Sequence, residues 1–419
     1  MKLISTAGRA GRVKIDALLA RRNAAYERAL PAARRIVEGV RKGGDVALRR
    51  YASKFDGNSR PEIRISPEEM QDALEAISPP VERALRTAAR NIRAFAERQK
   101  PKDWNFAPTS GVIVGQRIRP IGNVGCYVPS GRYPLPSTLL MTAIPAQVAG
   151  VGRIVVVSPR PALETLAAAA LLGITEFYRL GGAHAIAALA YGTESIPRVD
   201  KIVGPGNAFV TAAKKLVAFD CAIDMLAGPT EIVVTSERGD PDEIAADLVA
   251  QAEHDPDAAA IFITTNATLA QAVIANVKQR ARTNTTAAES IARNGAAIVA
   301  SSLEEARSLT NAIAPEHLTV DAMEDLAWVN NAGSVFIGRY SAQPLGDYVS
   351  GPNHTLPTCG LARVRGGLSV MDYVKVMTVQ EYTPEGLRRL SPAAIALAEA
   401  EGLRGHADAI RARSLEVLK

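Results

Sequence analysis

The sequence predicts an α/β fold built from parallel sheets that are covered by helices on both faces. Short runs of β-branched residues, such as "RIVVVS" (153–158) and "EIVVTS" (231–236), have the length and composition of buried strands. Longer runs rich in Ala and Leu follow them and have the length of helices. The chain has 419 residues, which is enough for two domains with separate cores.

The individual elements follow in order along the chain. Amphipathic patterns predict helices over 14–50 and 80–100, and the alternating stretch 111–128, with its turn glycines, predicts strands. A regular alternation then begins, with strands expected at 153–158, 175–180, 231–236 and 259–265 and helices at 162–173, 183–192, 208–219 and 240–254. Beyond residue 371 the pattern is helical and predicts a C-terminal arm.

Composition excludes several classes of protein. The net charge is +6, but the basic residues are spread along helices with acidic residues among them, so we expect no nucleic-acid partner. Apolar runs such as "LETLAAAALLGI" are too short to span a membrane, and the N-terminus has no signal-peptide pattern, so we expect a cytoplasmic protein. The three cysteines, Cys126, Cys221 and Cys359, are far apart and are expected to be reduced thiols.

The predicted helix over 240–254 ends in an unusual polar group, "QAEHD". Asp240 is a suitable N-cap, Pro241 fits the first helical position, and the apolar stripe through Ile244 and Leu248 continues to Gln251 and to the edge position His254. Gln251 and His254 are therefore expected to face the interior, where polar groups need partners. Two interpretations remain open: a functional site, or a pair that caps the helix end. Spacing also leaves undecided which edge of the sheet they face.

Two further clusters combine histidines with carboxylates. "APEHLTV" places Glu316 beside His317 just before a strand, which suits a general base with a second proton-transfer group or, alternatively, an exposed turn. "LGDYVSGPNHTLPT" brings Asp347 and His354 into one loop, where they either converge on a site or only shape the turn.

Two glycine-rich segments open predicted helices. "LGGAHAIAALAYG" and "VGPGNAFVTAAKK" have the arrangement that binds phosphate groups through backbone N–H groups, although neither has the complete G-x-G-x-x-G pattern or a P-loop lysine. The alternative is a pair of tight turns between strand and helix.

With these motifs in view, the chain resembles the histidinol dehydrogenase family over nearly its whole length. The motifs that carry the resemblance occur in the family's order: "GCYVPSGRYPLPSTLLMTAIPAQVAGV", "GGAHAIAALAYGTESIPRVDKIVGPGNAFVTAAKK", "IDMLAGPTEIVV", "QAEHDPDA", "PEHL", "LGDYVSGPNHTLPT" and "AEGLRGHA".

The resemblance implies two incomplete Rossmann-like domains with small N- and C-terminal helical pieces. Residues 21–120 and 236–370 are expected to form the first domain, with the catalytic and metal residues, and residues 121–235 the second, NAD-binding domain. Residues 1–20 are expected to be an N-terminal helical segment, and residues 371–419 an arm exchanged between the subunits of a homodimer.

The resemblance also implies residue roles. Glu316 and His317 match the catalytic pair. One zinc ion per subunit is implied, with Gln251, His254, Asp347 and, from the partner subunit, the histidine at position 406 (His406) as ligands. The substrate, L-histidinol, is implied to contact the catalytic histidine and these zinc ligands, together with Thr230, His354 and Glu401. The positions implied to contact NAD are Tyr127, His184 and Asn207.

Two positions depart from the family pattern. The family commonly has Gln at the position of His184 and Ser at the position of Thr230. Threonine keeps the hydroxyl group, whereas histidine keeps a donor and an acceptor but changes the shape of the side chain and can carry a charge.

The implied reaction is a four-electron oxidation of L-histidinol to L-histidine through histidinal, with two NAD, in the last steps of histidine biosynthesis. One alternative is a related enzyme that oxidises another small polyol or amino alcohol with NAD. A second is a binding protein that has lost catalysis, against which the presence of all the implied zinc-ligand and catalytic residues argues.

Overall fold

The computed structural model describes residues 1–8, 11, 13, 15, 24–60, 62–130 and 133–414. These residues form two compact units. The larger unit contains residues 1–99 and 121–373, and the smaller, C-terminal unit contains residues 100–120 and 374–419. No helix among the described residues is long and apolar enough to cross a membrane.

The larger unit contains two sheets. Sheet A has the strand order β1-β12-β11-β10-β13-β14, and all of its strand pairs are parallel. Its strands are β1 (Lys2–Ser5), β10 (Glu231–Thr235), β11 (Ala259–Thr264), β12 (Ala296–Val299), β13 (His317–Val320) and β14 (Ser334–Ile337). The helices of this part are α9 (Pro241–Ala252), α10 (Ala267–Arg280), η3 (Ala281–Thr283), α11 (Thr285–Asn294), α12 (Leu303–Ile313), η4 (Met323–Ala327) and α13 (Gln343–Tyr348).

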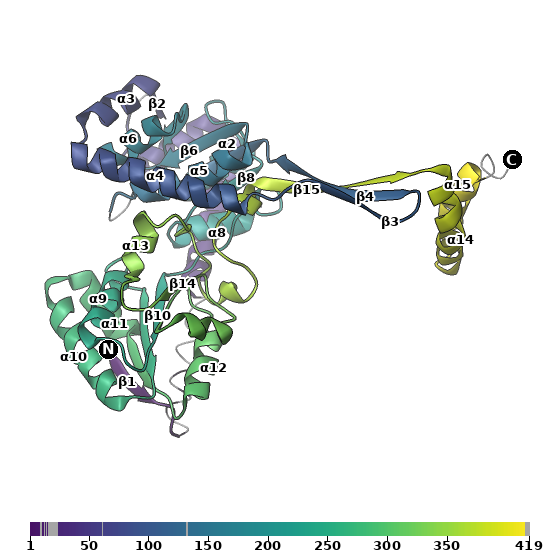
Figure 1. Cartoon of the computed structure of the whole chain (residues 1–419). Coiled ribbons are helices and arrows are strands. Elements are labelled where there is room, and N and C mark those ends of the chain that lie inside the picture. Colours follow the sequence, from purple (N-terminus) through teal and green to yellow (C-terminus); the bar gives the residue numbers. More distant parts are fainter. Residues whose placement is uncertain are drawn as a thin grey trace. The chain divides into compact units, whose positions relative to one another are not determined.

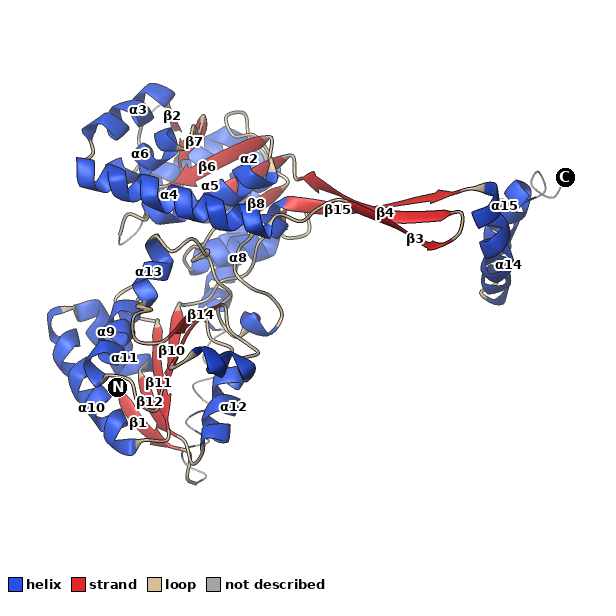
Figure 2. Ribbon diagram, in the orientation of Figure 1, coloured by secondary structure: helices blue, strands red, loops and turns tan. Residues whose placement is uncertain are grey.

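Helices cover both faces of sheet A because its strands alternate between two apolar cores. Ile232 and Val234 pack in the core that includes residues of α9, α10 and α11, whereas Val233 packs in the core that includes residues of α12. Figure 2 shows α9, α10 and α11 on one side of the strands and α12 on the other. This architecture confirms the α/β prediction.

Sheet B has the strand order β2-β7-β6-β5-β8-β9, in which only the edge strand β2 runs antiparallel to its neighbour. Its strands are β2 (Arg64–Ile65), β5 (Asn123–Tyr127), β6 (Arg153–Ser158), β7 (Glu176–Arg179), β8 (Lys201–Val203) and β9 (Ala222–Ile223). The accompanying helices are α2 (Ala24–Tyr51), η2 (Ala52–Asp56), α3 (Pro67–Ala76), α4 (Pro79–Gln99), α5 (Pro136–Ala149), α6 (Leu163–Leu171), α7 (Gly182–Tyr191) and α8 (Ala208–Val217). The short helices η5 (Leu361–Arg363) and η6 (Val370–Tyr373) also belong to this unit.

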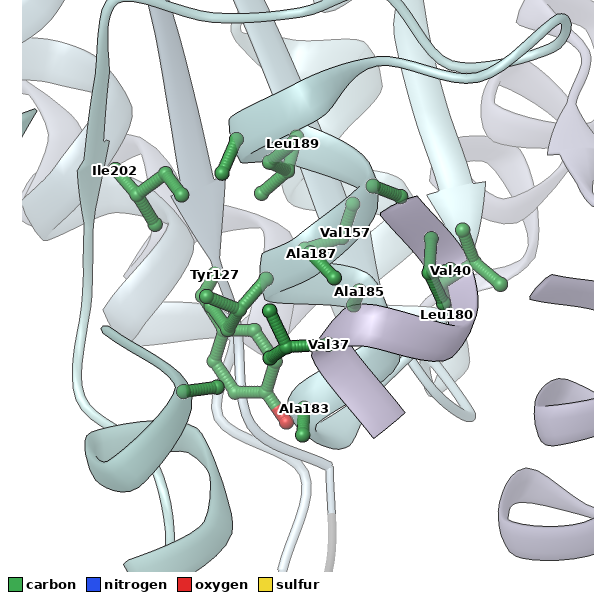
Figure 3. Packing of buried hydrophobic residues seen from close by; sticks show 14 of the residues in the cluster. Val37, Val40, Tyr127, Val157, Leu180, Ala183, Ala185, Ala187, Leu189 and Ile202 are labelled. Carbon is green, nitrogen blue, oxygen red and sulfur yellow. The ribbon is translucent and has the colours of Figure 1, made fainter. Parts of the chain in front are cut away.

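One apolar core of sheet B fixes the position of Tyr127, a candidate site residue. The core joins α2, α7 and α8 to β5, β6 and β7. Figure 3 shows the ring of Tyr127 in this core beside Val37 of α2 and Ala183 of α7. Tyr127 is thus held at the end of β5 by packing on several sides.

The C-terminal unit combines an antiparallel sheet with two helices. The strand order is β15-β4-β3, with β3 (Trp104–Thr109), β4 (Val112–Pro120) and β15 (Val374–Tyr382). The strands are followed by α14 (Pro384–Ala400) and α15 (Arg404–Ser414), which pack against each other. Figure 1 shows the chain entering this unit twice, first in blue and later in yellow-green.

The expected domain boundaries differ from the structure in several places. The N-terminal helices α2, α3 and α4, grouped above with residues 236–370, pack instead against α7, α8, α6 and α5 of sheet B. An amphipathic pattern shows which helix face is buried but does not specify the partner surface. Strand β10, grouped above with residues 121–235, belongs to sheet A.

The two chain ends match their expected helical character only in part, since α14 and α15 of the C-terminal arm are helices as predicted. Residues 2–5 form a strand along β12, with Ile4 buried, rather than a helix. Residues 9, 10, 12, 14 and 16–20 of the expected N-terminal helical segment lie outside the described residues, as does the start of the helix expected over 14–50. Within the expected arm 371–419, residues 374–382 form strand β15 rather than a helix. This strand pairs with β4, which lies in the stretch 111–128 that was predicted to form strands.

Candidate active site

A cavity of about 1030 Å³ lies in the larger unit between the two sheets. Ten of the residues singled out from the sequence line it: Tyr127, His184, Asn207, Thr230, Gln251, His254, Glu316, His317, Asp347 and His354. Segments more than 200 residues apart in the sequence therefore meet at one place.

The two sheets present opposite edges to the cavity. Sheet B contributes its carboxyl edge, since Tyr127 ends β5 and the glycine-rich loops follow β7 and β8. Sheet A contributes its amino edge, because Thr230 precedes β10 and His317 begins β13. The sequence left undecided which edge of a sheet Gln251 and His254 face, and the structure places them at the amino edge of sheet A. The C-terminal end of a helix lies at this edge because it leads into the start of the next parallel strand.

Glu316 and His317 lie side by side at the start of β13 and are both buried. Glu316 Oε2 accepts hydrogen bonds from Thr230 Oγ1 at 2.5 Å and from the backbone N–H of Glu231 at 2.9 Å. His317 Nδ1 lies 3.6 Å from the same carboxylate oxygen and 3.3 Å from the carbonyl oxygen of Glu231. The start of β10 thus fixes both side chains, so the alternative of an exposed turn is excluded.

The other ring nitrogen of His317 is directed toward Asp347. Nε2 lies 3.4 Å from Asp347 Oδ1, is buried, and has no hydrogen-bond partner. Burial by itself lowers the pKa of His317, but the charges of Glu316 and Asp347 outweigh it and raise the pKa to about 10. Burial raises the pKa of Asp347, yet the neighbouring His317 leaves it below the ordinary value. His317 therefore lies between the carboxyl groups of Glu316 and Asp347, whose charges favour the protonated form of its ring.

Gln251 occupies the inward position that the helical stripe predicts. Its side chain is buried, its Nε2 donates to Thr230 Oγ1, and its Oε1 has no hydrogen-bond partner. A buried amide oxygen without a partner costs free energy of about 1–3 kcal/mol, so the site is arranged for a further group.

His254 lies beyond the helix rather than on it. Helix α9 ends at Ala252, and His254 follows in a turn, where it is exposed while lining the cavity. The expectation that it faces the interior from the helix edge is therefore wrong, because the helix ends two residues earlier. Its Nδ1 lies 3.1 Å from the carbonyl oxygen of Ala250, which leaves Nε2 as the nitrogen free to bind a ligand.

His354 is tied to the same loop as Asp347. Its Nδ1 lies 2.7 Å from the backbone carbonyl oxygen of Asp347, and its Nε2 lies 3.2 Å from Thr138 Oγ1 of α5. Burial lowers the pKa of His354 although Asp347 opposes this. The two residues converge as one of the two interpretations expects.

The carboxyl edge of sheet B is organised by hydrogen bonds between protein groups. Tyr127 OH accepts from the backbone N–H of Gly182, and Asp56 Oδ2 accepts from that of Gly181 at 2.9 Å. The same Asp56 oxygen lies 2.9 Å from His184 Nε2. The N–H groups of Gly181 and Gly182 therefore already have partners, so this turn is a poorer phosphate site than its glycines suggest.

The second glycine-rich loop carries Asn207. Asn207 caps α8, since its Oδ1 accepts from the N–H groups of Phe209 and Val210. It is exposed and lines the cavity.

The remaining two predicted residues belong to the C-terminal unit. Glu401 caps the end of α14, and His406 lies in the first turn of α15; both side chains are exposed. Across the residues that the structure describes, no three His, Cys, Asp or Glu side chains gather to hold a metal ion by themselves.

Three polar neighbours of the site were not singled out from the sequence. Gln343 is buried and donates from Nε2 to Asp347 Oδ2 at 2.8 Å. Gln343 precedes Asp347 by four residues in a short helix, and this spacing could have predicted that the two side chains are in contact. Thr138 and Asp56 carry no such signal, since each meets its histidine only through the tertiary fold.

Comparison with known proteins gives a consistent result. The family model described as "Histidinol dehydrogenase" matches residues 19–414. The chain is 47% identical to histidinol dehydrogenase of Methanothermobacter thermautotrophicus (strain ATCC 29096 / DSM 1053 / JCM 10044 / NBRC 100330 / Delta H) over 90% of this chain and 92% of that protein. It is also 47% identical to histidinol dehydrogenase of Bacillus thuringiensis subsp. konkukian (strain 97-27) over 96% of both chains.

A solved structure agrees with these relatives. The crystal structure of histidinol dehydrogenase from Elizabethkingia anophelis superposes with a TM-score of 0.89 at 36% identity and covers 93% of each chain. The family match, the two relatives and the shared fold all extend over nine tenths or more of the chain. The chain therefore belongs to the histidinol dehydrogenase family of oxidoreductases.

Proposed function

We propose that this chain oxidises L-histidinol to L-histidine through histidinal, with two NAD and one zinc ion per subunit, as a homodimer with shared active sites. The observation that carries the proposal is the pairing of Glu316 and His317 at the amino edge of sheet A, facing the glycine-rich loops of sheet B across one cavity. Membership of the family supplies the substrate.

The donor groups beside the amino edge of sheet A suit a zinc ion. Gln251 offers a buried oxygen without a partner, His254 offers Nε2, and Asp347 offers a carboxylate. Zinc accepts such nitrogen and oxygen ligands, and a fourth is expected from His406 of a second copy of the chain. A bound zinc ion supplies a Lewis acid that binds and orients nitrogen donors of the substrate.

His317 is the base for both oxidations. It removes the proton of the alcohol in the first oxidation, and bound NAD supplies the hydride acceptor in each oxidation. A pKa of about 10 keeps His317 protonated near neutral pH. Engagement of Asp347 by a cation offsets one of the two charges that raise this pKa, so we expect a lower value in the metal-loaded protein.

Glu316 handles the water of the second oxidation. The aldehyde must first add water to form a gem-diol. A carboxylate beside His317 is placed to accept the proton of that water, while His317 returns to the aldehyde oxygen the proton that it took from the alcohol. His317 then removes a proton from the gem-diol as the second hydride leaves. The balance is one alcohol and one water converted to one carboxylic acid, with two hydrides transferred and two protons released.

The C-terminal unit suits a contact with a second copy. Its narrow antiparallel sheet exposes the apolar side chains of Trp104, Phe106, Val376 and Met377. Exposed apolar side chains gathered on a small sheet are typical of surfaces that another chain covers.

The test is a count of products with a matched variant. Purified protein loaded with zinc and given limiting L-histidinol is expected to form two NADH per substrate and release little aldehyde. Glu316→Gln should reduce oxidation of histidinal more than oxidation of histidinol, because only the aldehyde step requires activated water. One NADH per histidinol with free aldehyde from the wild-type protein would instead favour a related alcohol dehydrogenase.

A further inference from the structure

A buried ion pair lies beneath the loop that carries Asn207. Lys214 of α8 and Asp224, just after β9, form a salt bridge in which both side chains are almost completely inaccessible to solvent. Neither residue lines the cavity. Removing two charges from water carries a desolvation cost that can exceed the gain from their attraction, so such a pair is a weak stabilising device.

The pair holds one residue of the loop by both of its backbone groups. Lys214 Nζ donates to the carbonyl oxygen of Gly204 at 3.0 Å, and Asp224 Oδ2 accepts from the N–H of Gly204 at 2.8 Å. Asp224 Oδ1 also accepts from the N–H of Met225 at 2.5 Å. The two charges are thus satisfied mainly by each other and by the backbone at the loop's first residue.

Gly204 is held in a conformation that only glycine adopts readily. Its φ is +111°, and a Cβ atom there would come within 2.2 Å of the carbonyl oxygen of Tyr127. The loop therefore runs directly against the end of β5. Gly204 begins the segment that leads through Pro205 and Gly206 to Asn207, so its orientation sets the path of the loop into the cavity.

We propose that Lys214 and Asp224 are positioning residues that hold the loop 204–207 in the shape that receives the nicotinamide cofactor. Charge-assisted hydrogen bonds to both backbone groups of one residue fix its peptide orientation more firmly than neutral bonds. A site that is ordered before binding loses less entropy on binding, so the pair contributes to NAD affinity rather than to the proton transfers. This inference rests on the proposed use of NAD.

The experiment compares two double variants in the zinc-loaded protein. Lys214→Met with Asp224→Leu removes both charges and all the hydrogen bonds to Gly204 while keeping similar volume. We expect Kd and KM for NAD to rise at least tenfold, with kcat at saturating NAD within about threefold of wild type. Lys214→Gln with Asp224→Asn keeps a donor and an acceptor for Gly204 and should recover most of the NAD affinity.

A matched control removes another ion pair from the same sheet. Arg153 and Glu176 are the first residues of β6 and β7, joined at 2.6 Å at the amino edge of sheet B, and they do not line the cavity. Arg153→Met with Glu176→Leu should leave Kd for NAD unchanged. An unchanged Kd in the Lys214/Asp224 apolar variant as well would overturn the inference, as would an equal loss in the control.

A second measurement needs no variant. If the pair orders the loop, the backbone N–H of Gly204 should exchange slowly with deuterium in the free protein and change little when NAD binds. Fast exchange that becomes slow only with NAD would show that the cofactor orders the loop, and would overturn the inference. Failure of the wild-type protein to bind NAD at all would contradict the proposed function instead, so the two failures are distinguishable.

Discussion

The two edges that meet at the cavity are built in different ways. At the amino edge of sheet A, the ionisable side chains of Glu316 and His317 meet Asp347 of α13 beside a buried amide oxygen without a partner. The carboxyl edge of sheet B presents loops in which the backbone N–H groups of Gly181, Gly182 and Gly204 already have partners within the protein. At sheet A, the buried amide oxygen gains a partner only when a ligand binds. At sheet B, the loops are ordered by the protein's own hydrogen bonds before a ligand binds. We therefore expect changes at sheet A to affect chemistry and metal binding, and changes at sheet B to affect cofactor affinity.

The largest expected effect is the loss of the base at sheet A. His317→Asn should lower kcat by about 10²- to 10⁴-fold, because it removes the proposed general base. Zinc content and Kd for NAD should stay close to wild type, and both can be measured on the same preparation. A kcat within threefold of wild type would assign the base elsewhere.

The next effect concerns metal binding at the same edge. Gln251→Leu removes the buried oxygen that has no partner, so zinc affinity should fall by about 100-fold. Without metal, the variant should lose at most about 1 kcal/mol of stability relative to wild type, for two opposing reasons. The substitution removes one hydrogen bond, but it also removes one buried oxygen that has no partner. Chemical denaturation with and without zinc measures both quantities.

Gln343→Leu is the matched control for that change. Gln343 is also buried and also has an Oε1 without a partner, but it contacts Asp347 rather than the cavity. Its loss should lower zinc affinity by roughly tenfold, through the orientation of Asp347. If Gln343→Leu lowers zinc affinity more than Gln251→Leu does, the assignment of Gln251 Oε1 as the ligand oxygen is wrong.

A smaller effect is expected at the edge of sheet B. Tyr127→Phe deprives the Gly182 N–H of its acceptor and should raise KM for NAD about three- to tenfold with little change in kcat. Tyr373→Phe removes a comparable buried hydroxyl, bonded at 2.8 Å to the carbonyl oxygen of Thr142, and should lower stability without changing KM. Equal changes in KM would show a loss of folding rather than of cofactor contact.

The smallest effect concerns pH and stability on the helix that carries Gln251. Burial raises the pKa of Asp247 on α9 to about 6. A raised carboxyl pKa favours folding below about pH 4 and loses that contribution as pH rises through 6. Between pH 4 and 6.5, the free energy of unfolding of the wild type should therefore fall by on the order of 1–2 kcal/mol more than that of Asp247→Asn. Parallel unfolding curves for both proteins over that range would refute this assignment.

The sequence predicted the core of each sheet better than the way the parts pack. Strand-length runs such as Ile232–Val234 and Val155–Val157 signal buried strands directly, because both faces of a parallel sheet are covered. Helices α2, α3 and α4 were assigned to the other sheet, since an apolar stripe does not name its partner. The position of His254 beyond α9 depended on one helix end, which is the least predictable feature of a helix.

Site residues divide in the same way. Glu316, His317 and Asp347 stood out because the motifs "APEHLTV" and "LGDYVSGPNHTLPT" each combine a carboxylate with a histidine. Thr138, Asp56 and the Lys214–Asp224 pair did not, since each is defined by a partner that the tertiary fold brings to it. The roles of Glu401 and His406 in the C-terminal unit stay predictions.

The division between the two edges is tested most directly by the affinity for NAD with and without zinc. If the loops of sheet B are ordered independently of sheet A, Kd for NAD measured by calorimetry should change by less than about threefold when zinc is removed, and the zinc affinity should be equally insensitive to NAD because such coupling is reciprocal. A change of tenfold or more in either affinity would show that the two edges form one cooperative site and would contradict this account.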